Sequence, residues 1–215
     1  LGLVGSEMCI RDSYGKGGQV SASDDTTSSS TSTSKDSTRT LAVIESDAKS
    51  VEKSVAALQE TGDKSLFNEV TKTDENGNKT TGYDTDAIYK AVKNFTDSYN
   101  SLIDEVGNSN TKSILRAGAS MVNVTEANRK SLSDIGISIG ADNKLTIDEE
   151  KFKKTDMSKV KAMFADSSYY GTEVKRQAGR AESYAKSEAA KANTYQKSGS
   201  YTYNYRTGEL YNSTI

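Results

Sequence analysis

Asp74, Asn76 and Asn78 alternate along the chain in a pattern that could bind a divalent cation. The first ligands of an EF-hand calcium loop have the same spacing. The sixth position of such a loop, however, is Lys79 where glycine is required, and the twelfth is Thr85 where a bidentate glutamate is required. The sequence therefore predicts a solvated hairpin turn at this point and no calcium site.

A second acidic group consists of Asp142, Asp148, Glu149 and Glu150. Lys144 and Thr146 occupy the intervening positions at which further ligands would be expected. Carboxylates at the start of a helix are stabilised by the helix dipole. We therefore interpret residues 148–150 as the cap and first turn of a helix.

Other chemistry has few candidates, since the chain contains no histidine and its only thiol is Cys9. Histidine is the commonest general base and a frequent metal ligand, and a nucleophilic serine or cysteine usually relies on it. No glycine-rich phosphate loop is present. We predict that the protein is not an enzyme and that it has no catalytic, cofactor-binding or metal-binding residue.

The composition excludes several classes of partner. Of 215 residues, 28 are basic and 30 acidic, so no basic excess indicates nucleic acid or an anionic membrane surface. No apolar run approaches the ~20 residues that a membrane-spanning helix needs. A hydrophobic content of 33% also argues against one compact core running through the whole chain.

The first 40 residues are not expected to contribute to the fold. Residues 1–13 resemble a translated sequencing adapter, and they lack the basic and apolar segments of a signal peptide. Residues 21–40 contain fourteen serines and threonines. Such a segment can bury too little apolar area to offset the entropy that is lost when the chain is ordered. We predict an adapter artefact followed by a flexible linker.

Two helices with a narrow apolar seam are predicted over residues 41–60 and 85–106. The first seam is Leu41, Ile44, Ala48, Val51, Val55 and Leu58, and the second is Ile88, Val92, Phe95, Tyr99, Leu102 and Val106. This alternation of three and four is typical of helices that pack lengthwise. The seams could pack on each other within one chain or pair between chains. A weaker third helix is predicted over 111–132.

Two hairpins and two short helices are predicted between and after these segments. The first hairpin covers 66–83 around Asn76-Gly77, a pair that favours tight turns. The second covers 135–147, where Asn143 is expected to adopt a left-handed conformation. Asp148 and Asp156 are expected to cap the short helices that follow.

Residues 166–215 differ in character from the preceding part. A helix there carries a stripe of mostly small residues: Val174, Ala178, Ala181, Ala185, Ala189 and Ala192. Beyond Ser198, Tyr201, Tyr203 and Tyr205 alternate, which indicates a strand or an adhesive segment. We therefore divide the chain into residues 1–40, 41–165 and 166–215.

The segment from Leu132 to Phe164 carries a family resemblance. It contains Leu132-Ser-Asp-Ile-Gly-Ile137, then Leu145-Thr-Ile-Asp148, and ends on Val160-Lys-Ala-Met-Phe164. It resembles the C-terminal segment of the flagellar filament-capping protein family, also called hook-associated protein 2. A second block, Phe95-Thr-Asp-Ser-Tyr-Asn-Ser-Leu102, is similar to a helix of the same family. Asn143 and Phe152 depart from the family's usual glycine and leucine.

The expected fold is a mostly helical α+β protein, a helical bundle with two small hairpins between a flexible linker and a tyrosine-rich tail. The resemblance implies a structural or assembly protein of the bacterial flagellum, located outside the cell. Its implied partners are flagellin, other flagellar axial proteins and further copies of itself. Self-association through the helix in residues 166–215 is expected to be weak, because the alanines of its stripe would bury little apolar area. The alternative is a secreted or cell-surface adhesive module without a flagellar role.

Overall fold

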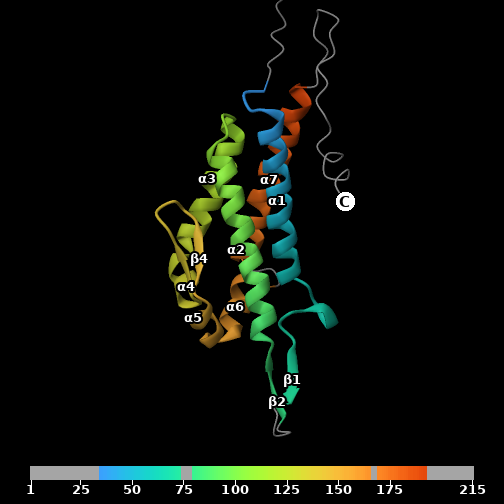
Figure 1. Cartoon of the computed structure of the whole chain (residues 1–215), viewed down its shortest axis with the longest axis vertical. Coiled ribbons are helices and arrows are strands. Elements are labelled where there is room, and N and C mark those ends of the chain that lie inside the picture. Colours follow the sequence, from blue (N-terminus) through green and yellow to red (C-terminus); the bar gives the residue numbers. More distant parts are fainter. Residues whose placement is uncertain (1–33, 74–78, 166–168, 193–215) are drawn as a thin grey trace, which may run out of the picture. The chain divides into compact units, whose positions relative to one another are not determined.

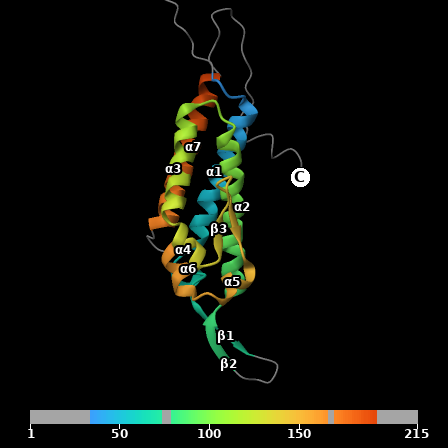
Figure 2. The same ribbon diagram turned by 90° about the vertical axis from the view of Figure 1, so that its left-hand side faces the viewer.

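The computed structural model describes residues 34–73, 79–165 and 169–192. Four of the described helices are long: α1 (Thr38–Leu58), α2 (Thr85–Gly107), α3 (Lys112–Ala127) and α7 (Tyr169–Ala192). They lie side by side, with α1 packed on both α2 and α7, and α7 packed on α3 (Figure 1). Figure 2 shows the same arrangement from the side, with the small second sheet and the short helices against one part of it.

Helix α1 contains the first predicted seam, and every residue of that seam is buried. Ser37 caps the helix by accepting a hydrogen bond of 3.0 Å from the Thr40 N–H. The helix thus begins at Thr38, earlier than predicted. The prediction of a flexible linker over 21–40 is wrong for its last residues, because capping extends the helix into them.

The first hairpin pairs β1 (Glu69–Thr73) with β2 (Lys79–Tyr83), after the short 3-10 helix η1 (Gly62–Lys64). Glu69 is opposite Tyr83 and Thr73 is opposite Lys79, in antiparallel register. The turn of this hairpin, at 74–78, lies outside the described residues. Asp84 then caps α2 by accepting from the Ala87 N–H at 3.5 Å.

The third predicted helix is divided into α3 and α4 (Arg129–Asp134), so the prediction of one continuous helix over 111–132 is wrong. The division falls at Asn128, whose side chain donates to the Val124 carbonyl at 2.8 Å while its N–H bonds to Thr125 O. Asparagine side chains compete in this way with the helical hydrogen bonds. Leu132 consequently reaches the core from a separate short helix.

The second hairpin pairs β3 (Ile137–Ile139) with β4 (Leu145–Ile147), and Asn143 in its turn has φ 63°, as predicted. Two short helices follow, α5 (Glu149–Lys154) and α6 (Met157–Phe164). Their caps are the predicted Asp148 and Asp156, which accept from the Lys151 and Ser158 N–H groups.

One apolar cluster joins the helices and the second hairpin. Phe95, Leu132, Ile135 and Phe164 are at most 1% exposed in it, and Ile147 packs against it half-buried. The described part of the chain is therefore the predicted mostly helical α+β fold with two small hairpins. The predicted division of the chain into three parts remains a prediction, although α7 shares its core with α1 and α3.

Candidate functional site at the junction of the two motif blocks

The Phe95–Leu102 motif places its apolar side chains in the core, where Phe95, Tyr99 and Leu102 are fully buried. The Phe95 ring lies edge-on to Phe164, with centroids 5.1 Å apart, and to Tyr170, with centroids 6.0 Å apart. Such pairs add about 0.5–1.5 kcal/mol to the effect of burial alone. Because Phe164 ends α6 and Tyr170 lies in the first turn of α7, the motif on α2 joins the last two helices.

The turn between α4 and β3 requires a glycine for two reasons. Gly136 has φ 86°, in the left-handed region that residues with a Cβ rarely adopt. A Cβ at this position would also lie 3.0 Å from the Phe152 nitrogen and 3.2 Å from the Asp148 oxygen. The Gly136 carbonyl in turn accepts from the Asp148 N–H at 2.8 Å. This glycine therefore sets the start of α5 directly against the turn.

Asn100, the polar residue of the α2 motif, binds the backbone of β4. Its side-chain nitrogen donates to the Leu145 carbonyl at 2.8 Å, and its side-chain oxygen accepts from the Leu145 N–H at 2.7 Å. A neighbouring strand would supply a similar pair of hydrogen bonds. Asn100 thus fastens the second hairpin to α2, and the two motif blocks form one structural junction.

Lys153 links α5 to α2. Its ammonium lies 2.7 Å from Asp86 and 2.6 Å from Glu149, and 5.3 Å from the centroid of the Tyr89 ring. The hydrogen bonds to Asp86 and Glu149 raise the pKa of Lys153 above its ordinary value. Exposed ion pairs contribute little to stability, so we interpret Lys153 as a surface link between α5 and α2.

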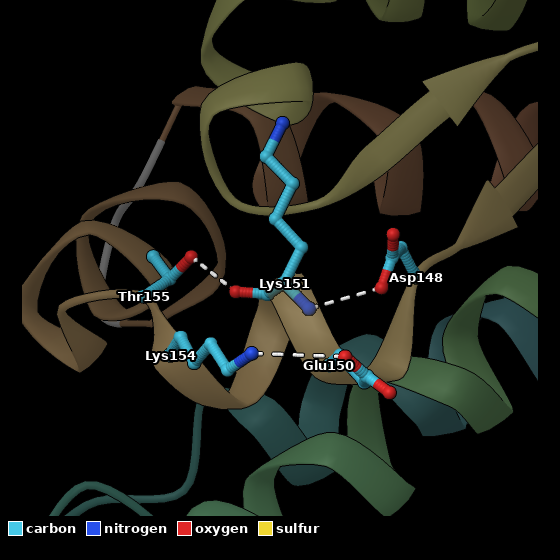
Figure 3. Close-up of a pocket in the computed structure, with 5 residues that line it drawn as sticks. All are labelled: Asp148, Glu150, Lys151, Lys154 and Thr155. Atoms are coloured by element: carbon cyan, nitrogen blue, oxygen red, sulfur yellow. Dashed lines mark hydrogen bonds and ion pairs between the residues drawn. The ribbon is translucent and has the colours of Figure 1, made fainter.

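The predicted acidic group is divided between two places. Figure 3 shows the surface hollow at α5, which is lined by Asp148, Glu150, Lys151, Lys154 and Thr155. The Asp148 carboxylate accepts from the Lys151 N–H at 2.9 Å, and the Thr155 hydroxyl donates to the Lys151 carbonyl at 2.9 Å. Lys154 pairs with Glu150 at 3.6 Å. The residues that line the hollow thus bond to one another within α5 and at its two ends, and Asp148 is the cap of this helix, as predicted.

Asp142 lies away from that hollow, in the turn between β3 and β4, where it accepts from the Lys144 N–H at 3.2 Å. Within residues 34–73, 79–165 and 169–192, no group of three or more His, Cys, Asp or Glu side chains could hold a metal ion. No helix in the same ranges is long and apolar enough to cross a membrane.

The described residues of all three predicted apolar stripes pack into the core of a single chain. The seams of α1 and α2 are 0–3% exposed, and the α7 stripe is 0–2% exposed at Val174, Ala178, Ala181 and Ala185. Ala189 packs against the same core, and nothing is described of the Ala192 side chain. Of the two arrangements left open for the seams, the structure shows packing within one chain.

Several predicted features lie outside the described residues. They are the adapter-like residues 1–13 with Cys9, the linker up to residue 33, the turn with Asp74, Asn76 and Asn78, and the tail with Tyr201, Tyr203 and Tyr205. Two described residues were missed by the sequence interpretation, Asp36 and Tyr170, which are 7% and 2% exposed. Asp36 gave no periodic signal, and Tyr170 precedes the predicted stripe of α7.

The family model described as flagellar hook-associated protein 2 C-terminus matches residues 107–214. This range is half of the 215-residue chain and contains the motif from Leu132 to Phe164, while the motif on α2 lies just before it. No curated protein and no solved structure matches the chain. The matched family is that of the flagellar filament cap, a structural assembly at the extracellular tip of the filament. The chain belongs to the flagellar hook-associated protein 2 family, through the C-terminal region of that family.

Proposed function

We propose that this chain is a structural component of the filament cap and that it contacts flagellin and further copies of itself. The family match over residues 107–214 carries this proposal. It is supported by the packing of both motif blocks into one junction, in which Asn100, Gly136 and Phe164 each have a specific structural role. The proposed role is mechanical and needs no reacting group.

The contacts are expected to use the outer surface of the helices, since the apolar stripes are already buried within the chain. In the described residues, only four large apolar side chains are more than a third exposed: Val70, Leu115, Tyr169 and Tyr184. Tyrosine is enriched among residues that dominate interface energies. With so little exposed apolar area, self-association is expected to be weak and dependent on concentration.

Binding to flagellin can be tested with purified monomeric flagellin and the full chain, by biolayer interferometry. We expect saturable binding by the folded chain. Phe164→Asp, which places a charge in the fully buried core, is the matched control, because an unfolded chain should lose specific binding. A folded chain, verified by circular dichroism, that shows no saturable binding to flagellin monomers or filaments would contradict the proposal.

Self-association can be tested by sedimentation velocity over a hundredfold range of concentration. The mean sedimentation coefficient should rise with concentration, and Tyr184→Ser should reduce the rise if α7 contributes to the contact. The adhesive module would be favoured by three results together: the chain stays monomeric at all concentrations, it does not bind flagellin, and it does adhere to cell surfaces.

A further inference from the structure

Asp36 is buried although it lies in a stretch rich in serine and threonine. It precedes α1 by two positions and is 7% exposed. Burying a carboxylate is strongly unfavourable unless hydrogen bonds or opposite charges compensate it. The compensation comes from residues 109–111, which connect α2 to α3 and lie more than 70 positions along the chain.

Both carboxylate oxygens of Asp36 are hydrogen-bonded. Oδ2 accepts from the Ser109 hydroxyl at 2.7 Å and from the Thr111 hydroxyl at 2.6 Å. Oδ1 accepts from the backbone N–H of Asn110 at 2.6 Å and from its side-chain amide at 3.2 Å. Ser109, Asn110 and Thr111 thus each donate to this single side chain.

These donors keep the carboxylate ionised. Burial by itself raises the pKa of Asp36, but the hydrogen bonds from Asn110, Thr111 and Ser109 outweigh it and hold the pKa below its ordinary value. Hydrogen bonds to an ionised acceptor are stronger than those between neutral groups. Residues 109–111 therefore favour the ionised form of the Asp36 carboxylate.

The start of α3 is built around this contact. Thr111 occupies the N-cap position of α3, yet its side chain makes no capping hydrogen bond to that helix. Its hydroxyl donates to Asp36 instead, while its N–H bonds to the Ser109 hydroxyl oxygen at 3.1 Å. The next residue after Asp36, Ser37, caps α1. Two adjacent residues thus fix the start of α1: Ser37 bonds to its own helix, and Asp36 bonds to Thr111 at the start of α3.

We infer that Asp36 is a latch that fastens the segment preceding α1 to the connection between α2 and α3. Figure 1 shows the start of α1 and that connection at the same end of the helices. Because of the latch, a pull on residues 34–36 is transmitted to the connection between α2 and α3 as well as to the first turn of α1. The inference is independent of flagellin binding.

Hydrogen exchange followed by mass spectrometry on the full chain tests the latch. In Asp36→Asn, which keeps the shape but removes the charge, amides of residues 37–42 and 109–114 should exchange about tenfold faster or more, in both segments together. Asp97→Asn, at an exposed residue of α2 that pairs with Lys93, should change neither segment.

Thr111→Val keeps the test decisive if Asp36→Asn does not fold, because it removes only one donor. It should speed exchange in both segments by a smaller factor, and combined with Asp36→Asn it should add little. Faster exchange confined to 37–42 in Asp36→Asn, or confined to 109–114 in Thr111→Val, would overturn the latch and leave Asp36 a local helix-start residue.

Discussion

Asn100 on α2 and Leu145 on β4, 45 positions apart in the sequence, are joined by two hydrogen bonds. The amide side chain satisfies both polar groups of the Leu145 backbone, at 2.8 and 2.7 Å. A two-stranded sheet is only marginally stable by itself and needs a surface to pack on. This pairing gives the second hairpin a fixed position on α2, in addition to its apolar contacts.

Asn100→Ala should lower the free energy of unfolding by about 1–3 kcal/mol, since it leaves a backbone donor and acceptor of Leu145 without their partner. Urea unfolding followed by circular dichroism measures the loss. Asn94→Ala is the matched control, because Asn94 is an exposed residue of the same helix and alanine is a better helix former there. Equal stability of the two variants would show that the pairing contributes nothing.

Gly136→Ala should destabilise the protein through both backbone conformation and contact. The left-handed conformation costs a residue with a Cβ roughly 1–2 kcal/mol, and the added atom would lie 3.0 Å from the Phe152 nitrogen. A loss of this size lowers the thermal midpoint by about 2–8 °C.

Gly107→Ala is the control for that variant, because Gly107 has nothing within 4 Å of an added Cβ and no positive φ. It should be neutral or stabilising. If Gly136→Ala melts at the wild-type temperature, the turn is not the constraint on α5 that its geometry indicates.

The elements that sequence could predict are those whose cause is local. The seams of α1 and α2 follow from apolar spacing, and the helix starts at Asp84, Asp148 and Asp156 follow from capping. The left-handed Asn143 is likewise a property of one residue in a turn. In each case the information lies within a few positions of the residue concerned.

Features that depend on distant partners could not be predicted. Asp36 resembles any other residue of a polar linker until Ser109, Asn110 and Thr111 are brought beside it. The break at Asn128 has local partners but gave no signal either, since asparagine within a helix and asparagine at its end look alike in a sequence. The pairing of Asn100 with Leu145 also became visible only from the fold.

Glu52→Gln should raise stability at neutral pH. Burial, followed by the charge of Glu182 on α7, raises the pKa of Glu52 on α1, and Lys175 and Lys186 only partly oppose this. The folded state thus holds the proton more tightly than the unfolded chain. The ionised Glu52 carboxylate therefore lowers the free energy of unfolding. This loss of stability is absent below the ordinary pKa of about 4.5 and grows as pH rises through the pKa of the folded state.

The expected gain at pH 7 is roughly 0.2–1 kcal/mol, the range for partly exposed charge pairs, and it should vanish near pH 3.5. Thermal unfolding of Glu52→Gln and wild type at both pH values measures it. Glu60→Gln, at an exposed residue just after α1, should show no comparable gain. A gain that persists unchanged at low pH would exclude titration of Glu52 as its cause.

Tyr99 carries a buried hydroxyl that makes no hydrogen bond within the described part of the chain. Burial raises its pKa to about 12, and the nearby Thr125 hydroxyl only partly opposes this. Thr125 instead donates to the Met121 carbonyl at 2.9 Å and lies 3.4 Å from the Tyr170 hydroxyl. The folded chain thus keeps the Tyr99 hydroxyl protonated at neutral pH.

Tyr99→Phe should therefore leave stability at pH 7 unchanged or slightly higher, since it removes an unsatisfied polar group. In the wild type the unfolded chain loses this proton above about pH 10, whereas the folded chain keeps it to about pH 12. Stability should consequently fall over this window, by up to about 1.4 kcal/mol per pH unit for one group.

Urea unfolding at pH 7, 10 and 11 measures this fall in stability. The fall should be shallower for Tyr99→Phe than for wild type or for the control Tyr184→Phe, which changes a more exposed tyrosine. Some fall should remain, because burial also raises the pKa of Tyr170. A clear loss of stability at pH 7 in Tyr99→Phe would mean that the hydroxyl has a hydrogen-bond partner in solution.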